Sequence, residues 1–534
     1  MTIQDLLTAQ TTRLDVPALS WYRDGTFRDR YTRRDLREHA ATAAAHLIQL
    51  KVRSKDRVVV LSNNTPEMFF LLLSIMSLGA IVAPVNPQES SRVVRHMLAT
   101  LEPSLVVIGS GIEPHIGEVA ASRQCVAIED LFVPCHLNTF NVSGASVSER
   151  DTAVILFTSG TTSVPKGVCL SHRNLLTNAD GLNEIHKLTE NTVHLCVLPL
   201  FHANAFGFSL VTSVFAGSHV VLCNGLPGYG LWSIIAREEV NIVSAVPQIL
   251  RMLSARRPAR RPSDCLRYFV SAAAPLSKKV ATDFLTATGV RVHQGYGLSE
   301  CVNFATTIPG DVADSTYEQA MFGERVPSIG TPLEGCDVFV RRVEEAGQAL
   351  EGEEGEIVVT GDTLMSGYWR NEDATRKAIV GGGLRTGDLG FFKVLDGRRF
   401  FFITGRLKEI IMRHGEKISP LAVEIDLQDL HAYGKFAVAG FENAAAGEEI
   451  GLYVHAVDRV HHAGITRVVN ACAPVSRPRL VMIGQQPIPL TSTGKVRRER
   501  LAQRFTSFSG HVFGKEPVIV EDTSFGGQLG EAFG

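Results

Sequence analysis

Short apolar runs alternate with helical patterns through the first half of the chain. β-branched residues are concentrated at 57–61, 104–108 and 219–222, and the segments between them carry apolar residues at helical spacing. Strands that alternate with helices form mostly parallel sheets covered by helices on both faces. The pattern up to about residue 240 therefore predicts an α/β fold.

The pattern changes in the second half of the chain. From residue 328 to 404, short apolar strands are separated by glycines, which predicts a small β-rich subdomain. A chain of 534 residues is longer than a single core supports. We therefore predict a large N-terminal domain of α/β sheets at 1–405, which includes this subdomain, and a small α+β C-terminal domain at 406–505. Residues 506–534 are rich in glycine, and we expect a loosely attached tail.

One stretch resembles a membrane span. Residues 68–87 contain no charged side chain, and their apolar density approaches that of a transmembrane helix. Two serines, a glycine and a proline interrupt the stretch, which favours a buried helix followed by a short strand. The N-terminus lacks the basic start and the apolar stretch of a secretory signal. We therefore predict neither an integral membrane segment nor a secretory signal.

Charge and cysteine usage narrow the classes of partner. The 53 basic and 55 acidic residues leave a net charge of −2, which gives no electrostatic footprint for nucleic acid or an anionic membrane. The nine cysteines are scattered, without the paired spacing of a metal site. Free thiols of this kind are typical of a reducing cytosol, so a cytoplasmic location is predicted.

The strongest local motif is a loop of small hydroxylated residues and glycine at 158–167, directly after an apolar strand. Its backbone N–H groups and hydroxyls can approach phosphate oxygens closely, and Lys166 adds a positive charge. The spacing is not that of the Walker loop. The alternative is a solvated turn, which the length of the motif disfavours.

A second cluster, Gln294–Glu300, combines an aromatic ring, a hydroxyl and a carboxylate. Tyr296 could stack on a purine, Ser299 could reach a phosphate, and Glu300 could hold Mg²⁺, which prefers oxygen ligands. A Tyr-Gly turn that caps a helix beginning at Leu298 explains the cluster nearly as well.

Two further segments carry charged candidates. In Arg385–Asp388 and the following Gly405–Lys408, a carboxylate could accept both hydroxyls of a ribose, and Arg406 could bind the ribose or its phosphate. Turn chemistry alone also accounts for the sequence Thr-Gly-Asp. In Pro489–Lys495, the lysine taken by itself is most simply a solvated surface charge.

Taken in chain order, these four segments resemble the acyl-adenylate superfamily, which includes acyl- and aryl-CoA ligases, nonribosomal peptide adenylation domains and luciferases. The resemblance runs from about Tyr31 to Leu501, and Asn86–Pro87 and Leu198–His202 also match. The chain is most similar to a fatty-acid or aryl-acid CoA ligase. The resemblance implies a mobile C-terminal domain, a hinge at Lys408 and an active site between the two domains.

The resemblance also implies roles for individual residues. Lys495 would contact the carboxylate and the α-phosphate during acyl-AMP formation, and His202 would lie at the gate beside the carboxylate. Glu300 would ligate Mg²⁺, so these three form the predicted catalytic set. Gly415 would line the thiol tunnel after rotation of the domain. The residues assigned to ATP and AMP are Thr158, Ser159, Gly160, Thr161, Thr162, Lys166, Ala272, Ala273, Ala274, Gln294, Gly295, Tyr296, Gly297, Ser299, Asp388 and Arg406.

Four positions depart from the usual pattern of the superfamily. Ser299 and Glu409 replace Thr and Asp and keep the functional group, whereas Ala422 stands where Glu is common. Ser163 stands where the phosphate loop usually has glycine, which would allow a positive φ that serine adopts only with strain. We expect weaker nucleotide affinity from Ser163 but retained activity.

The substrate is predicted to be an acid without an α-amino group. Amino-acid-activating members of the superfamily use an aspartate just after the region of His202, and residues 206–215 contain no acid. A fatty or aryl acid is therefore expected. Phe206 and Phe208 indicate an apolar acyl pocket, although two core aromatics on a helix explain them at least as well.

The acceptor of the acyl group is expected to be coenzyme A. No carrier-protein serine motif follows residue 505, so the chain does not carry its own acceptor arm. Basic residues that could meet the phosphates of coenzyme A are Arg413, His414, Lys417, Arg477 and Arg479. A separate carrier protein and an amine are the alternative acceptors, and a non-catalytic ligand-binding paralogue is a further alternative. The predicted cofactors are thus ATP, Mg²⁺ and coenzyme A, and the sequence does not indicate an oligomeric state.

Overall fold

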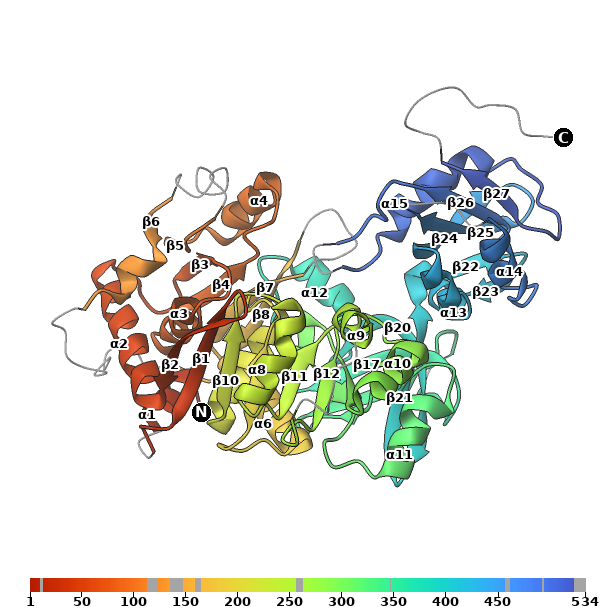
Figure 1. Cartoon of the computed structure of the whole chain (residues 1–534). Coiled ribbons are helices and arrows are strands. Elements are labelled where there is room, and N and C mark those ends of the chain that lie inside the picture. Colours follow the sequence, from red (N-terminus) through yellow and green to blue (C-terminus); the bar gives the residue numbers. More distant parts are fainter. Residues whose placement is uncertain are drawn as a thin grey trace.

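The fold is known from a computed structural model. It describes residues 1–9, 13–112, 123–134, 147–158, 165–255, 263–345, 347–456, 462–491 and 494–522. Figure 1 shows the N-terminal part as a large body of sheets and helices, with the chain after about residue 411 forming a smaller body beside it.

A seven-stranded sheet holds strands β3 to β8 together with β18, in the order β18-β8-β7-β4-β3-β5-β6. Strands β3 to β7 run parallel and β8 returns antiparallel to β7. The bounds are β3 Arg57–Leu61, β4 Ile81–Val85, β5 Leu105–Ile108, β6 Cys125–Ala127, β7 Thr152–Phe157, β8 Gly167–Ser171 and β18 Gly367–Tyr368. Helices on its faces are α2 Arg33–Gln49, α3 Pro66–Ser77 and α4 Ser91–Leu101.

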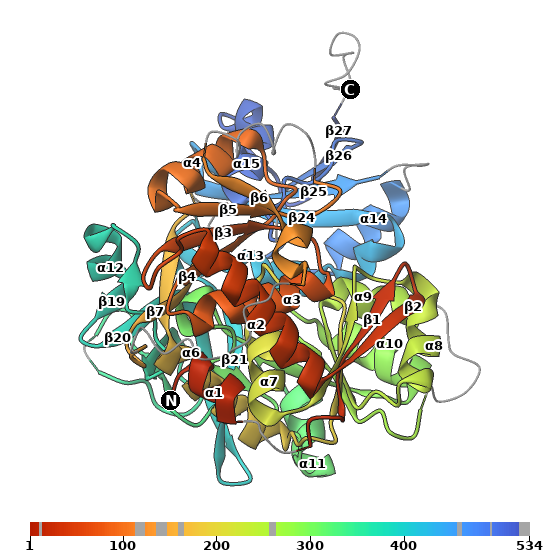
Figure 2. The same cartoon turned by 90° about the vertical axis from the view of Figure 1, so that its left-hand side faces the viewer.

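Strand β3 illustrates why this sheet is covered on both sides. Its alternate residues Val58 and Val60 join the core that includes α2 and α3, whereas Val59 and Leu61 pack with α4. Successive side chains of a strand point to opposite faces, so a continuous apolar run belongs in a doubly covered sheet. Figure 2 shows α2 and α3 in front of these strands.

A second, nine-stranded sheet follows the order β15-β14-β13-β12-β11-β9-β10-β1-β2. Its strands are β1 Pro17–Arg23, β2 Thr26–Thr32, β9 Val193–Cys196, β10 His219–Cys223, β11 Ile242–Ala245, β12 Tyr268–Ser271, β13 Arg291–Tyr296, β14 Thr306–Thr307 and β15 Thr331–Pro332. The accompanying helices are α6 His172–His186, the π-helix η2 Ala205–Thr212, α7 Ser213–Ala216, α8 Leu231–Arg237, α9 Pro247–Ser254 and α10 Lys278–Thr288. The predicted α/β class is confirmed, but the strands divide between two sheets, which the local pattern did not indicate.

The apolar stretch at 68–87 lies inside the first core. It forms most of α3, whose residues are almost all buried, and then β4, as predicted. Across the residues that the structure describes, no helix combines the length and the apolar character that crossing a bilayer requires.

The glycine-punctuated region forms a five-stranded antiparallel sheet, as its pattern predicted. Its strands are β16 Cys336–Arg341, β17 Gly355–Gly361, β19 Ile379–Val380, β20 Gly383–Leu395 and β21 Arg398–Arg406, with helix α12 Glu372–Ala378 between β18 and β19. The long β20–β21 ribbon ends just before the predicted hinge at Lys408, which lies in a short 3₁₀ turn.

The last part of the chain has its own sheet and its own core. Its strands are β22 Ile411–Arg413, β23 Glu416–Ile418, β24 Lys435–Asn443, β25 Gly447–His455, β26 Leu480–Gly484 and β27 Val518–Glu521. Its helices are α13 Pro420–Asp426, α14 His462–Asn470 and α15 Arg498–Ala502. The residues of its two apolar clusters all lie at or after Ile411.

The predicted loose tail is wrong for its first part. Strand β27 pairs in parallel with β26, so the chain is integrated into the sheet up to Asp522. Ile519 packs on one apolar cluster of this domain and Val520 on the other, which explains the attachment. The prediction rested on the glycine content of the tail and did not consider the run Val518–Val520. Residues 523–534 lie outside the described part.

Four histidines are buried neutral in the N-terminal core, which predicts acid-sensitive stability. Burial lowers the pKa of His172 to about 4 and of His194 and His293 to about 3, and it lowers that of His186 well below the ordinary 6.5. Between these values and 6.5 the unfolded chain binds more protons than the folded one. The stability is therefore complete above pH 6.5 and falls as the pH drops, by about 1.4 kcal/mol per histidine and pH unit.

Urea unfolding between pH 8 and pH 4.5 measures this slope. His194→Asn should make the decline shallower, whereas His96→Gln, at an exposed position, should leave it unchanged. An unfolding free energy that stays level from pH 6.5 to 5 would contradict the expectation.

Candidate active site

The base of the phosphate loop is closed by a backbone hydrogen bond. Thr158 follows β7, Lys166 precedes β8, and the N–H of Thr158 donates to the carbonyl of Lys166 at 2.9 Å. The rest of the predicted loop lies outside the described residues: Ser159, Gly160, Thr161, Thr162 and Ser163. Their assignment stays a prediction.

Tyr368 connects this loop to the proposed magnesium ligand. The Lys166 ammonium lies over the Tyr368 ring, 4.9 Å from its centroid, and the Tyr368 hydroxyl donates to Glu300 Oε1 at 2.7 Å. Burial and the Glu300 carboxylate raise the pKa of Tyr368, so the hydroxyl keeps its proton. The sequence reasoning missed this residue, whose only signal was an aromatic pair after Gly367 in a strand-like run.

Tyr368→Phe is expected to lower the apparent affinity for Mg²⁺ without removing activity. The ring beneath Lys166 is kept, but Glu300 loses the donor that orients it, and loss of such a partner raises the half-saturating Mg²⁺ concentration about tenfold. Titration of Mg²⁺ in ATP–pyrophosphate exchange measures the effect. Tyr31→Phe removes a hydroxyl away from the site and serves as the control; equal Mg²⁺ curves for wild type and Tyr368→Phe would refute the role.

Asp388 is the centre of the predicted ribose site. It is buried on β20 and accepts hydrogen bonds from the Tyr296 hydroxyl and from Arg406 Nε, both at 2.7 Å. Arg406 stands directly across from Asp388 in the β20–β21 ribbon. Burial and Asp388 raise the pKa of Tyr296 well above its ordinary value, and Asp388 raises the pKa of Arg406. These three predicted residues therefore come together.

The predicted adenine segments follow neighbouring parallel strands. Ala272–Ala274 come after β12, and Gln294 and Gly295 lie on the adjacent β13. Gly297 is required by space, because a Cβ there would lie 1.9 Å from the carbonyl oxygen of Asn303. The alternative of a helix from Leu298 is wrong, because Ser299 opens only a three-residue 3₁₀ turn, Ser299–Cys301.

Glu356 on β17 holds the bulge of β20 that carries Asp388, called here the Arg385–Asp388 turn, and the motifs did not reveal it. Its side chain is only 3% exposed. Its Oε2 accepts from Arg385 Nε at 2.6 Å and its Oε1 from the N–H of Gly387 at 3.1 Å. Arg341 forms a second ion pair with it at 3.4 Å. A buried carboxylate thus fixes the Arg385–Asp388 turn from behind.

Lys495 of the C-terminal domain reaches the charged residues of the N-terminal domain. Its pKa is lowered from the ordinary 10.5, because the surrounding protein desolvates the ammonium group and Arg406 repels it. The charges of Asp388, Glu300 and Glu409 act in the opposite direction. The side chain is nevertheless exposed to solvent. Charges of the N-terminal domain therefore act on Lys495, whose assignment to catalysis stays a prediction.

The residues predicted to bind the carboxylic acid are His202, Phe206 and Phe208, and all three are largely or fully enclosed by the protein. Burial lowers the pKa of His202 to about 4, so its imidazole is neutral at neutral pH. Phe206 and Phe208 have no exposed surface and lie on η2 inside the core, where Phe208 packs against His194 and Phe304. The structure thus agrees with two core aromatics and does not place either ring at a surface open to an acyl group. The motif could not distinguish the two because both require apolar residues.

The site fits a magnesium ion that is shared with phosphates. Glu300 supplies carboxylate oxygens, the ligand type that Mg²⁺ prefers, and Tyr368 engages only Oε1. Among the described residues, no group of three or more His, Cys, Asp or Glu side chains could hold a metal by itself. Mg²⁺ commonly binds through one or two carboxylates together with substrate phosphates.

Comparison with known families decides the assignment. The model of the family described as AMP-binding enzyme matches residues 7–369, about two thirds of the chain. The chain belongs to the family of AMP-binding enzymes. The resemblance drawn from its motifs is therefore confirmed.

Relatives of this AMP-binding enzyme share nearly their whole length with it. Long-chain-fatty-acid–CoA ligase FadD13 of Mycobacterium tuberculosis is 27% identical, over 92% of this chain and 96% of its own. Feruloyl-CoA synthase of Amycolatopsis sp. is 28% identical, over 88% of this chain and 93% of its own. The structure of ATP-bound MatB from Rhodopseudomonas palustris superimposes with a TM-score of 0.84 at 22% identity, covering 95% of this chain and 100% of MatB, which shows a shared fold.

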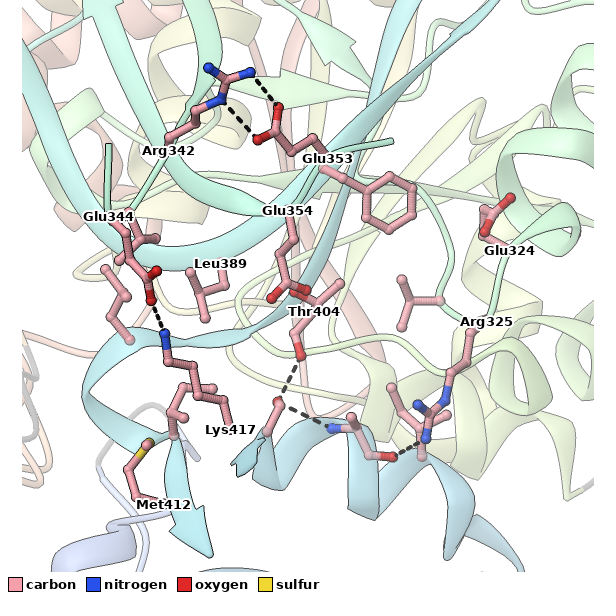
Figure 3. A pocket seen from close by; sticks show the side chains of 18 of the residues that line it. Glu324, Arg325, Arg342, Glu344, Glu353, Glu354, Leu389, Thr404, Met412 and Lys417 are labelled. Atoms are coloured by element: carbon pink, nitrogen blue, oxygen red, sulfur yellow. Dashed lines mark hydrogen bonds and ion pairs between the residues drawn. The ribbon is translucent and has the colours of Figure 1, made fainter. Parts of the chain in front are cut away.

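The AMP-binding enzyme has a cavity of about 770 Å³ between the β-rich subdomain and the C-terminal domain (Figure 3). Leu389 lines it, and since neighbours on a strand point to opposite faces, it lies on the other side of the ribbon from Asp388. Two ion pairs join the domains here: Lys417–Glu344 between cavity-lining residues, and the pair of the lining residue Arg325 with Asp426. All four side chains are at least 31% exposed, and such pairs stabilise little.

Gly415, the predicted tunnel residue, lies in the turn between β22 and β23 with a φ of +85°. This hairpin also carries Lys417 at the cavity. No hydrogen bond or ion pair among the described residues links the hairpin to the nucleotide site. Its assignment to a thiol tunnel is untested by this conformation.

Proposed function

We propose that this AMP-binding enzyme is an AMP-forming acid–thiol ligase that converts a carboxylic acid to its coenzyme A thioester. The position of Lys495 carries the proposal. A lysine from the C-terminal domain lies in the electrostatic field of Glu300 and Asp388 of the N-terminal domain and of Arg406, the last residue of β21 before the hinge turn. A non-catalytic paralogue would have no need to bring these charges together across two domains.

In the first half-reaction, a carboxylate oxygen of the acid attacks the α-phosphorus of ATP, and pyrophosphate leaves with the electron pair of the broken P–O bond. Lys495 stabilises the negative charge that develops on the attacked phosphate and orients the carboxylate. Asp388 and Arg406 hold the ribose, and Lys166 binds phosphate. Mg²⁺ bound by Glu300 and the phosphates would supply charge neutralisation.

In the second half-reaction, the thiolate of coenzyme A attacks the acyl carbon of the acyl-AMP, and AMP leaves. This step requires the C-terminal domain to rotate about Lys408, so that the hairpin with Gly415 replaces Lys495 at the site. The weak, exposed ion pairs at the domain boundary support such a motion, because little free energy is lost when they separate.

The acid is proposed to lack an α-amino group and to be fatty or aryl. The whole of η2, which follows His202, is buried and contains no carboxylate that could pair with an ammonium group. The relatives named for long-chain fatty acids and for ferulic acid support both classes.

Coenzyme A remains the proposed acceptor, with fewer candidate contacts than the sequence suggested. Arg413 is 7% exposed and pairs with Glu449, and Arg479 donates to backbone carbonyls within its own domain. Arg477 likewise donates to the carbonyls of Asn470 and Cys472. His414 and Lys417 are the remaining basic candidates. We place the enzyme in the cytoplasm, since the eight cysteines that the structure describes are free thiols.

The test is ATP–pyrophosphate exchange with a panel of fatty, aryl and amino acids, followed by AMP release with and without coenzyme A. Exchange with a fatty or aryl acid and AMP release that requires coenzyme A are expected. If exchange occurs but AMP release does not respond to coenzyme A, the acceptor would instead be a carrier protein or an amine. A lack of exchange with every acid would overturn the proposal.

A further inference from the structure

Arg498, three residues after Lys495, binds two carboxylates through its branched guanidinium group, an arrangement that we call the fork. Its Nη1 and Nη2 donate to the two oxygens of Glu424 at 2.6 and 2.9 Å, and its Nε donates to Glu409 Oε2 at 2.7 Å. Nη1 also donates to the carbonyl of Val438. The Arg498 side chain is only 14% exposed. Four donor contacts in one rigid plane specify a position far more closely than a flexible lysine would.

The partners of Arg498 belong to three different elements. Glu424 lies on α13 and Val438 on β24, both of which contribute to the core of the C-terminal domain. Glu409 ends the 3₁₀ turn that contains the predicted hinge Lys408. Arg498 itself is the first residue of α15. The fork therefore ties the start of α15 to the domain core and to the hinge turn at once.

The segment with Lys495 is joined to itself by backbone bonds and to the domain by Ile488 and Val496, which pack on one of its apolar clusters. The N–H of Thr491 donates to the carbonyl of Lys495, and the N–H of Lys495 donates to the Thr491 hydroxyl. These bonds close a small turn upon itself. Beyond it, the backbone of Arg497 donates to the carbonyl of Pro489. The turn is thus compact, and its place relative to the domain depends on this apolar packing together with the contacts that hold the start of α15.

By binding Glu409, Arg498 also affects the charge around Lys495. Its carboxylate acts electrostatically on both Lys495 and Arg406. Without Arg498, this carboxylate would be free to turn toward the Lys495 ammonium and pair with it. Such a pair would compete with the carboxylate and the phosphate of the substrates for the same cation.

We propose that Arg498 is a positioning residue for acyl-AMP formation: it fixes the turn of Lys495 against the domain core and keeps the Glu409 carboxylate away from the Lys495 ammonium. The inference rests on the proposed function, because it gives Lys495 a role in the first half-reaction only. It follows that Arg498 affects adenylation and leaves thioester formation from ready-made acyl-AMP unchanged.

The experiment compares both half-reactions in the full-length enzyme. Arg498→Gln should slow ATP–pyrophosphate exchange about 10- to 100-fold, the range that a misplacement of about 1 Å causes. Arg498→Lys, which keeps the charge but loses the fork, should fall between this variant and the wild type. The rate from synthetic acyl-AMP and coenzyme A should stay within about twofold. Arg500→Gln is the matched control, because Arg500 is exposed on the same helix.

A double-variant cycle with Lys495→Ala separates positioning from general damage. If Arg498 acts through Lys495, adding Arg498→Gln to Lys495→Ala should cost nothing further in exchange. Multiplying losses, or an equal loss in both half-reactions, would overturn the inference, and so would unchanged exchange in Arg498→Gln. If Arg498→Gln does not fold, Arg498→Lys decides by the same criteria. If the wild-type enzyme shows no exchange with any acid, the proposed function itself would be overturned, whatever the behaviour of the Arg498 variants.

Discussion

Replacement of Lys495 by alanine is expected to slow acyl-AMP formation about 10²- to 10³-fold, the scale of losing one preorganised electrostatic contact at a reacting centre. We expect the lysine to supply the cation that the first half-reaction needs, because the charges of Asp388 and Glu300 act on it across the domain boundary. ATP–pyrophosphate exchange measures the rate. Because the pKa of Lys495 is lowered, the charge is lost as the pH rises through a value below 10.5, which sets an alkaline limit in the wild type.

Folding and ATP binding should remain nearly intact in Lys495→Ala, since the side chain is exposed and the hydrogen bonds seen for Lys495 within the described residues are made by its backbone. Lys435→Ala, at an exposed position of β24 in the same domain, provides the matched control. An exchange rate in Lys495→Ala equal to that of the control would remove Lys495 from the mechanism.

The second large effect is expected from Glu356→Gln. The side chain keeps its shape but loses the charge shared by Arg341 and Arg385, and breaking a buried ion pair of this kind lowers the unfolding free energy by about 3 kcal/mol. The Arg385–Asp388 turn would also lose its anchor. We therefore expect the KM for ATP to rise about tenfold, because Asp388 would no longer be held for the ribose.

Two readouts separate the effects on stability and on the nucleotide site. Urea unfolding measures the first, and the preference for ATP over 2′-deoxy-ATP, which should shrink, measures the second. Glu353→Gln is the control: Glu353 pairs with Arg342 in the same subdomain but is 39% exposed, so less than about 1 kcal/mol should be lost. An unchanged preference for ATP in a destabilised Glu356→Gln would limit Glu356 to a structural role.

Much of the candidate site was predictable because its motifs are contiguous in the chain. Lys166, Glu300, Asp388 and Arg406 each stand in a short run whose residue types suit phosphate, metal or ribose, and the order of the runs identified the family. Tyr368 and Glu356 were missed for a physical reason. Tyr368 meets Glu300 across 68 residues, and Glu356 meets Arg385 across 29, so neither pairing has a local signal.

The fold was predictable to the level of its elements. The alternation of strands and helices indicated the α/β class, but a strand's apolar pattern does not tell which neighbour it pairs with. The division into two sheets, the pairing of β27 with β26 and the burial of Phe206 and Phe208 all depend on contacts between distant segments. The hinge at Lys408 remains a prediction, because one conformation does not show motion.

The β20–β21 ribbon is the shared wall of two compartments, with Asp388 on the nucleotide side and Leu389 on the side of the cavity between the domains. For protein engineering, this arrangement offers an indirect handle. A change of side-chain volume at Leu389 would repack this cavity, yet it would act one peptide bond away from Asp388, the residue proposed to hold the ribose. Variants selected for altered nucleotide use need not be confined to residues that touch the nucleotide.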